Sequence, residues 1–407
     1  MNKPTRRAVA FLASVTALVL VACGTREPAP EWSSVWAAAA QHPATQNWSA
    51  DGFADETVRQ VVRLTDGGPQ VRVRLSNRYG TEPLAVAGAT VARSAGGAAL
   101  APGSVHRLTM ARSTTFDVAP GAEAASDPIT LPVSAGEAVT VTLYFARPTG
   151  PATQHAQAAT TSFRAAGDHA PEPAATPFTE TSRSWYYLTG VDAIGAEREV
   201  TVAFGDSITD GYRSTVDTDQ RYPDQLARHP GTGPHAVVNA GISGNRLLTD
   251  STVLGDSARL RFRRDVLEQP GVDTVIVLIG INDIGLAGTT GPDGVLSPDV
   301  SADQLIAGYR ELIGAAHAAG VRVIGATLLP FGGSVYYSPG KDDLRTQVNT
   351  WIRTGNAFDA VVDLDRALAA PDDRSRLARQ FDSGDHLHPN DLGYGAMAAA
   401  IAGAGVL

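Results

Sequence analysis

The sequence predicts a two-domain chain in which an antiparallel β domain precedes an α/β domain with a parallel sheet. Two patterns along its 407 residues carry this prediction. Up to about residue 190, short alternating runs of apolar and polar residues are separated by Gly- and Pro-rich turns, whereas beyond it apolar runs alternate with helical stretches. The length exceeds that of one ordinary domain, and 43% hydrophobic residues suffice for two cores. We therefore predict a β domain over 32–195 and an α/β domain over 196–407.

The first 31 residues read as a targeting segment rather than as part of a fold. A basic start, Lys3 to Arg7, precedes an apolar stretch from Ala8 to Ala22 that is too short to span a bilayer comfortably. We predict a signal peptide over 1–22 and a short tether over 23–31, which contains two prolines.

The apolar stretch ends in Leu20-Val-Ala-Cys-Gly24, which is similar to the bacterial lipobox. That resemblance implies that Cys23 becomes lipid-modified and forms the new N-terminus. The mature protein would then be exported and anchored to the outside of the bacterial cell membrane. Cys23 is the only cysteine, so it cannot take part in an internal disulfide. The alternative is a plain secretory signal with an incidental cysteine.

Charge limits the class of partner. The net charge is −9, and the signal peptide holds three basic residues and no acidic one, so 30 basic and 42 acidic residues remain after it. Nucleic-acid-binding proteins carry basic patches, so this balance argues against a nucleic-acid partner.

In the first domain, alternation of apolar and polar residues predicts strands. Val71, Val73 and Leu75 alternate with arginines, and the segment 139–145 alternates apolar residues with threonines and a tyrosine. The segments 58–64 and 84–91 are weaker strands, and 166–177 reads as an irregular connection. Short strands with frequent Gly/Pro turns and no convincing helix favour an antiparallel sandwich or jelly roll.

In the second domain, apolar strands alternate with helical segments, which predicts a parallel sheet with helices on both sides. Apolar residues of 302–319 lie on one helical face, and a final helix is predicted from Asp391 to about Ala404. The predicted strands are 200–204, 236–239, 274–280, 321–329 and 360–364.

Polar clusters directly follow three of these strands. They are Gly205-Asp-Ser207, Asn239 to Gly244, and Gly280 to Asp283. Ligands of parallel sheets bind beyond the carboxyl ends of the strands, so all three clusters fall on the ligand-binding edge. A fourth cluster, Asp385-His-Leu-His388, lies in a loop before the final helix.

The residue types in these clusters suit serine-dependent hydrolysis, which needs a nucleophile, a base oriented by a third group, and donors for the oxyanion. Ser207 is the nucleophile by position, at an abrupt strand-to-helix junction. His388 is the candidate base, and the carboxylate of Asp385, three residues earlier, can reach its imidazole. His386 is a rival base, because it lies next to Asp385. Asp206 and Asp283 are predicted to accept backbone N–H bonds in turns.

Together the four clusters resemble, in order and spacing, the four signature blocks of the SGNH, or GDSL, hydrolase family, over roughly residues 198–407. The resemblance implies a three-layer α/β/α, flavodoxin-like domain and a Ser207–His388–Asp385 triad, and it favours His388 over His386. It also implies three oxyanion donors: the backbone N–H groups of Ser207 and Gly244 and the side-chain amide of Asn282.

The function we expect is ester hydrolysis through an acyl-enzyme, without metal or cofactor. The resemblance favours deacetylation of an extracellular glycan or cleavage of short-chain acyl esters. The alternatives are a lysophospholipase or lipase-type acylhydrolase, and a catalytically inert glycan-binding lipoprotein. A metallophosphoesterase reading of the Asp and His residues lacks an upstream Asp-x-His and further histidines near strand ends.

Overall fold

The structure, a computed structural model, describes residues 1, 32–195, 199–233 and 235–407. Apart from Met1, the predicted signal peptide, the tether and Cys23 therefore lie outside the described residues. No helix within the described ranges is long and apolar enough to cross a bilayer.

Two antiparallel sheets form the first half of the fold, as predicted. One has the strand order β1-β15-β3-β9, and the other runs β13-β12-β2-β10-β5-β6 with β7 beside β5. A single apolar core draws side chains from both sheets, which makes the pair a sandwich. The strands of the first sheet are β1 (Trp32–Ala37), β3 (Gln70–Ser76), β9 (Glu123–Ala125) and β15 (Leu188–Ile194). Those of the second are β2 (Glu56–Arg63), β5 (Gly88–Gly96), β6 (Ala99–Leu100), β7 (His106–Arg107), β10 (Ala138–Phe145), β12 (Ser162–Ala166) and β13 (Glu180–Ser182).

Two details of the sandwich differ from the prediction. The strand expected over 84–91 is two strands, because β4 pairs with β8 whereas β5 pairs with β10. Strands β1 and β15 were not predicted, although they pair with each other and β15 also pairs with β3. The remaining short strands are β4 (Leu84–Val86), β8 (Phe116–Val118), β11 (Gln154–His155) and β14 (Trp185–Tyr186).

The second half contains a five-stranded sheet in which every pair is parallel, in the order β17-β16-β18-β19-β20. This is the flavodoxin-like order, with the first strand of the domain flanked by the second and third. The strands fall at or within about two residues of their predicted starts. They are β16 (Val200–Gly205), β17 (Ala236–Gly241), β18 (Val272–Leu278), β19 (Arg322–Ala326) and β20 (Ala360–Val362).

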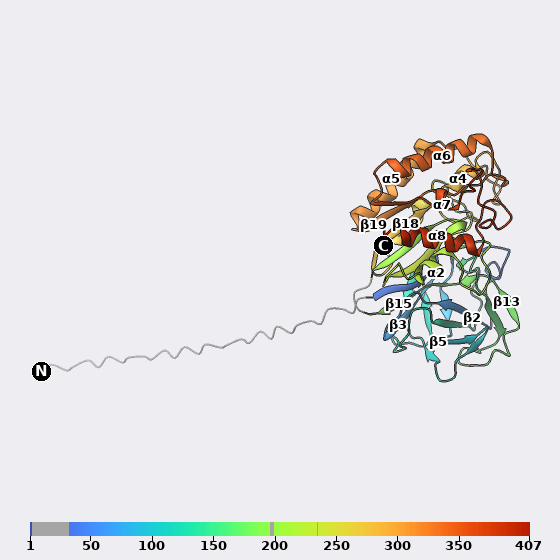
Figure 1. Cartoon of the computed structure of the whole chain (residues 1–407). Helices are drawn as coiled ribbons and strands as arrows, with labels where there is room; N and C mark the ends of the chain where they lie inside the picture. Colours follow the sequence, from blue (N-terminus) through green and yellow to red (C-terminus); the bar gives the residue numbers. More distant parts are fainter. Residues whose placement is uncertain (2–31, 196–198, 234) are drawn as a thin grey trace. The chain divides into compact units, whose positions relative to one another are not determined.

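Helices cover both faces of this sheet, which confirms the three-layer prediction. Helices α5 and α6 pack together on one face, and α2 and α8 pack together on the other (Figure 1). Ser301 begins α5 with a capping box, and α5 and α8 match the two predicted helices. The helices are α1 (Ser207–Asp210), α2 (Tyr222–Ala227), α3 (Ala258–Phe262), the π-helix η1 (Arg263–Leu267), α4 (Ile281–Leu286), α5 (Ala302–Ala318), α6 (Pro339–Thr354), α7 (Leu364–Leu368) and α8 (Asp391–Gly403).

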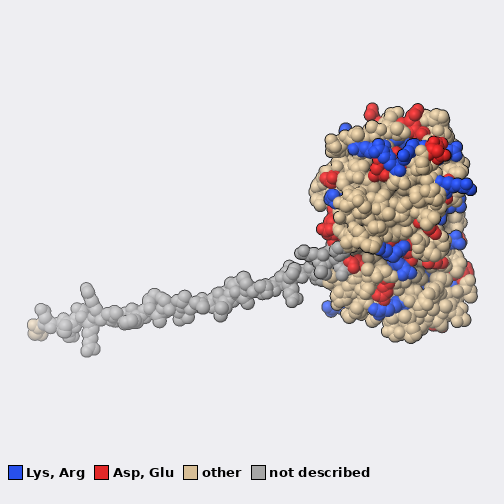
Figure 2. Space-filling model, viewed as in Figure 1, with Lys and Arg blue, Asp and Glu red and all other residues tan. Residues whose placement is uncertain are grey.

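The sandwich and the parallel sheet pack against each other within one compact unit, Glu31–Leu407. Strand β1 lies against β17, and the backbone N–H of Ser34 donates to the carbonyl of Pro270 at 2.8 Å. The side chain of Gln269 accepts hydrogen bonds from Ser34 and from Arg74. On the face shown in Figure 2, basic and acidic side chains are interspersed among uncharged ones.

Candidate active site

Ser207 is the first residue of α1 and follows β16 at a tight junction. Gly205 is required there, because a Cβ atom would lie 2.2 Å from Thr209 Oγ1 and 2.3 Å from the carbonyl oxygen of Leu278. Asp206 caps the helix: its Oδ1 accepts the backbone N–H of Ile208 at 3.1 Å. As the first helical residue, Ser207 has a backbone N–H without an acceptor inside the helix. The residue is buried, with 5% of its surface exposed.

The structure brings His388 and Asp385 to Ser207. Ser207 Oγ lies 2.8 Å from His388 Nε2, and His388 Nδ1 lies 2.9 Å from Asp385 Oδ2. A carboxylate only accepts, so Nδ1 carries the proton and Nε2 is left to accept from the serine hydroxyl. Both groups occupy the loop before α8, as expected.

Asp385 is held in its ionised form. Its Oδ1 accepts the backbone N–H groups of Leu387 at 3.0 Å and His388 at 2.8 Å. Burial alone would raise the pKa of Asp385, but the hydrogen bonds from the side chain and backbone of His388 hold that pKa well below its usual range. The carboxylate therefore stays charged, ready to stabilise an imidazolium at His388.

The structure places His386, the rival base, elsewhere. Its Nδ1 pairs with Asp382, its ring is half-exposed, and its backbone has the left-handed φ of 63°. The alternation of side chains in this turn thus sends His388 to the serine and His386 to the surface.

The second cluster forms a loop beside α1. Gly244 has a φ of +80°, which favours glycine, and the Leu254 side chain lies 2.6 Å from where a Cβ of Gly244 would stand. Just before it, the backbone N–H and hydroxyl of Ser243 both donate to Asp210 Oδ2, at 2.8 and 2.7 Å. Asp210, the last residue of α1, therefore ties this loop to the helix that begins at Ser207.

Asn282 lies in the first turn of α4, and its amide orientation is fixed by two partners. Its Nδ2 donates to the carbonyl of Asn245 at 3.0 Å, and its Oδ1 accepts the Tyr336 hydroxyl at 3.0 Å. The carbonyl of Asn245 can only accept, so the nitrogen must face it. This bond uses one of the two amide hydrogens.

Asp283 supports the neighbouring loop, as predicted. Its two carboxyl oxygens accept the backbone N–H groups of Leu247 at 2.7 Å and Leu248 at 3.0 Å. Burial raises the pKa of Asp283 to about 6.

Asp206 was also predicted to accept a backbone N–H, and its hydrogen bond from Ile208 at the start of α1 confirms this. Burial raises the pKa of Asp206 to about 7, and its Oδ2 is buried without a hydrogen-bond partner among the described residues.

The raised pKa of Asp206 predicts a pH dependence of stability. An unfolded Asp titrates near 3.9, so the folded state binds this proton more tightly, and its contribution to stability is lost as the pH rises from about 4 through about 7. We expect Asp206→Asn, which keeps an oxygen for the Ile208 N–H, to gain stability relative to the wild type over that range. Urea unfolding of both proteins from pH 4.5 to pH 8 measures the difference, and parallel curves would contradict the assignment.

Sequence reasoning missed several residues that contact the site. The ring of Tyr212 lies edge-on to the ring of His388, with the ring centroids 4.7 Å apart. Arg213 Nε lies 3.3 Å from Asp385 Oδ2. Tyr336 orients Asn282, as described above. Tyr212 and Arg213 stand directly after the first cluster and could have been suspected, whereas no local signal marks Tyr336.

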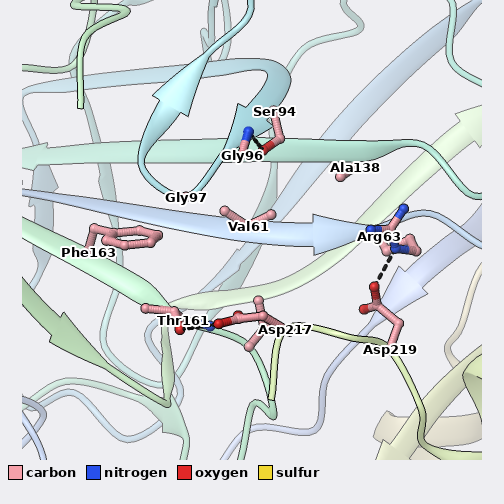
Figure 3. A pocket seen from close by; sticks show the side chains of 11 residues that line it. Val61, Arg63, Ser94, Gly96, Gly97, Ala138, Thr161, Phe163, Asp217 and Asp219 are labelled. Atoms are coloured by element: carbon pink, nitrogen blue, oxygen red, sulfur yellow. Dashed lines mark hydrogen bonds and ion pairs between the residues drawn. The ribbon is translucent and has the colours of Figure 1, made fainter. Parts of the chain in front are cut away.

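The segment after Arg213 connects the site to the sandwich. Asp217 accepts the backbone N–H and hydroxyl of Thr161 at 2.6 and 2.7 Å, and Asp219 pairs with Arg63 (Figure 3). These contacts border a cavity of about 320 Å³, into which Phe163 also faces. The sandwich thus fixes one end of the segment 212–219, and Tyr212 at its other end lies against His388.

Within the described ranges, one trio of side chains could hold a metal ion: Glu199, His235 and Asp273. They lie at the amino ends of β16, β17 and β18, the edge of the sheet opposite to Ser207. The trio shares no residue with the site.

Solved structures resemble about half of the chain. A GDSL-like lipase from Bacteroides thetaiotaomicron is 22% identical over 51% of this chain and 88% of its own, with a TM-score of 0.37. An acetylxylan esterase from Geobacillus stearothermophilus is 22% identical over 52% of this chain and 96% of its own, with a TM-score of 0.38. No curated protein sequence matches the chain significantly.

The family comparison covers the segment that holds the site. Residues 203–396 match the model of the GDSL-like Lipase/Acylhydrolase family, and this range begins in β16 and ends in α8. It includes the strand end that carries Ser207 and the loop that carries His388. Residues 203–396 are therefore a GDSL-like lipase/acylhydrolase domain, and the chain that contains it is a hydrolase of the esterase class.

Proposed function

We propose that the chain hydrolyses carboxylic esters through Ser207, His388 and Asp385. The observation that carries the proposal is the continuous line of hydrogen bonds from Ser207 Oγ to His388 Nε2 and from His388 Nδ1 to Asp385. Each member comes from a segment that the sequence alone had singled out. The arrangement supplies a nucleophile, a base in the correct tautomer and a charged group to orient that base.

In the proposed mechanism Ser207 Oγ attacks the ester carbonyl while His388 Nε2 takes its proton. The imidazolium is stabilised by Asp385. The negative charge on the carbonyl oxygen is stabilised by the Ser207 and Gly244 N–H groups and the free amide hydrogen of Asn282. His388 then gives the proton to the leaving alcohol, and the acyl-enzyme remains. Water attacks the acyl-enzyme with His388 again as base, and the bond from the acyl group to Ser207 Oγ breaks as His388 returns the proton to that oxygen. Apart from water, every step uses groups of this chain, so the proposal needs no metal or cofactor.

For the substrate, we propose short-chain acyl esters, foremost acetyl groups on an extracellular glycan. The proposal is supported by the side chains beside two of the donors: Leu254 lies against Gly244, and the Tyr336 hydroxyl donates to Asn282. We propose that these two side chains bound the acyl pocket and favour a short acyl group. A lysophospholipid substrate would require a longer pocket.

A panel of esters tests both parts of this proposal. We expect p-nitrophenyl acetate to be hydrolysed with a higher kcat/KM than the butyrate, and the octanoate to be the poorest of the three. Release of acetate from an acetylated polysaccharide and of fatty acid from a lysophospholipid, assayed side by side, identifies the natural class. A preference for octanoate and the lysophospholipid would replace the acetyl proposal by the lipase-type alternative. Binding of the polysaccharide without hydrolysis of any ester would favour an inert glycan-binding protein.

We further propose that the chain is exported and anchored to the cell membrane through Cys23. The support is the basic and apolar N-terminus and its lipobox-like end. We expect Cys23→Ala to leave the protein unprocessed or to release it from the membrane fraction. The mass of the mature N-terminal peptide is the measurement, because a single lipid signal gives only weak anchoring. An unmodified N-terminus in the wild type would contradict the proposal.

A further inference from the structure

His155 connects the β sandwich to the helix that carries Ser207. It lies in β11, which pairs with β14 through His155 and Trp185, and it is 4% exposed. Its Nδ1 lies 2.9 Å from the carbonyl oxygen of Ala39, and its Nε2 lies 2.9 Å from Oδ1 of Asp210. Asp210 is 1% exposed. A side chain of the sandwich therefore ends inside the hydrolase domain, in contact with the last residue of α1.

The other oxygen of Asp210 extends this connection to the loop that contains Ser243 and Gly244, called the oxyanion loop below. Oδ2 accepts both the backbone N–H and the hydroxyl of Ser243, whose neighbour Gly244 is one of the proposed oxyanion donors. One carboxyl group is thus shared between a residue of the sandwich and the loop beside the nucleophile. Its position decides where Ser243, and with it Gly244, stands.

The hydrogen-bond partners also define the charge of this pair. The carbonyl oxygen of Ala39 only accepts, so Nδ1 of His155 carries a hydrogen. Nε2 faces a carboxyl oxygen, so a second proton lies between His155 and Asp210. Whichever atom holds that proton, the pair is electrically neutral. Without His155, Asp210 would place a buried negative charge three residues from Ser207, where it would repel the oxyanion.

We propose that His155 is a positioning residue for ester hydrolysis: it neutralises Asp210 and so holds the Ser243–Gly244 loop in the geometry that receives the oxyanion. This inference rests on the proposed function, because it takes Ser207 as nucleophile and Gly244 as donor. The β sandwich then supplies a functional part of the active site. The Trp185 ring, 5.5 Å from the His155 ring, keeps the imidazole in place.

We expect His155→Ala to lower kcat for p-nitrophenyl acetate by roughly 10²-fold, the order of effect of a misplacement of about 1 Å, with KM nearly unchanged. Phosphonylation of Ser207 by a fluorophosphonate should slow in parallel, since it passes through the same oxyanion site. Titration with that reagent counts the active sites, so kcat refers only to folded enzyme. His155→Gln, which keeps a donor for Asp210, should recover part of the loss. If His155→Ala does not fold, the test uses His155→Gln instead. In whichever variant folds, a kcat per titrated site equal to that of the wild type would overturn the proposal.

A double-variant cycle tests the route through Asp210. In Asp210→Asn the charge that His155 neutralises is gone, so adding His155→Ala should lower kcat much less than it does in the wild type. If kcat of the double variant is lowered by the product of the two factors seen in the single variants, the proposal is overturned, because His155 would then act independently of Asp210.

The matched control is Gln269→Ala, which removes the side-chain hydrogen bonds of Ser34 and Arg74 to the hydrolase domain, far from the oxyanion loop. We expect a lower melting temperature and an unchanged kcat. An equal loss of kcat in Gln269→Ala would mean that any weakening of the contact between sandwich and hydrolase domain impairs catalysis, which contradicts a specific role of His155.

The proposed function is tested separately. Ester hydrolysis that persists in Ser207→Ala would reject the proposed function. If Ser207→Ala is inactive but the His155 variants keep the wild-type kcat, only the inference about His155 is rejected.

Discussion

Replacing Ser207 by alanine is expected to reduce ester hydrolysis to background, a loss of roughly 10⁶ in kcat as found when a serine hydrolase loses its nucleophile. No other hydroxyl is shown in contact with His388 Nε2 among the described residues. The residue is small, and the bond that its side chain loses is the one to His388, so the fold should persist with a nearly unchanged melting temperature. Steady-state hydrolysis of p-nitrophenyl acetate and a thermal melt of the same preparation measure both.

Ser214→Ala is the matched control for this variant. Ser214 is also buried and lies a few residues further along, but its hydroxyl donates to the carbonyl of Gly211. We expect it to keep kcat and to lose some stability. Hydrolysis by Ser207→Ala at even a hundredth of the wild-type kcat would contradict the role given to Ser207.

Asn282→Ala is expected to have the second largest effect, a loss of roughly 10²–10³ in kcat, which is typical of removing one oxyanion donor. The lost hydrogen bond strengthens only as the carbonyl oxygen gains charge, so KM should change little. A modest drop in melting temperature is expected as well, because the Tyr336 hydroxyl and the carbonyl of Asn245 lose their partner.

Asp283→Ala separates this effect from a loss of structure. Its carboxyl group accepts two backbone N–H groups of the neighbouring loop, so its removal should act chiefly through stability. We expect a larger fall in melting temperature than in Asn282→Ala and a smaller fall in kcat. If Asn282→Ala instead melts early and keeps a near-normal kcat, the amide is only a structural group of the loop.

The sequence predicted the parts of this fold that local patterns determine. Alternating apolar runs located β3 and β10, and continuous apolar runs located the five parallel strands. Burial of one face of a strand favours alternation, whereas burial of both faces favours a continuous apolar run. The polar clusters at strand ends located Ser207 and Asn282, because the carboxyl ends of parallel strands meet at one edge of the sheet. The loop of His388 follows no strand and was singled out by the spacing of Asp385 and His388.

The missed features depend on partners distant in the sequence. Tyr336 meets Asn282 across 54 residues, and His155 meets Asp210 across 55, so neither contact leaves a local pattern. Strand β15 has neighbours that lie far away along the chain, in β1 and β3. The segment 84–91 has a continuous strand-like composition, and only its two different pairing partners divide it.

The central claim is that Ser207 is the nucleophile activated by His388. The most direct measurement is labelling of the wild-type protein with a fluorophosphonate, followed by peptide mass spectrometry. We predict one modified residue, Ser207, with labelling that is lost in Ser207→Ala and strongly slowed in His388→Ala. Labelling at a different serine, or full hydrolytic activity in a protein that the reagent never modifies, would contradict the account.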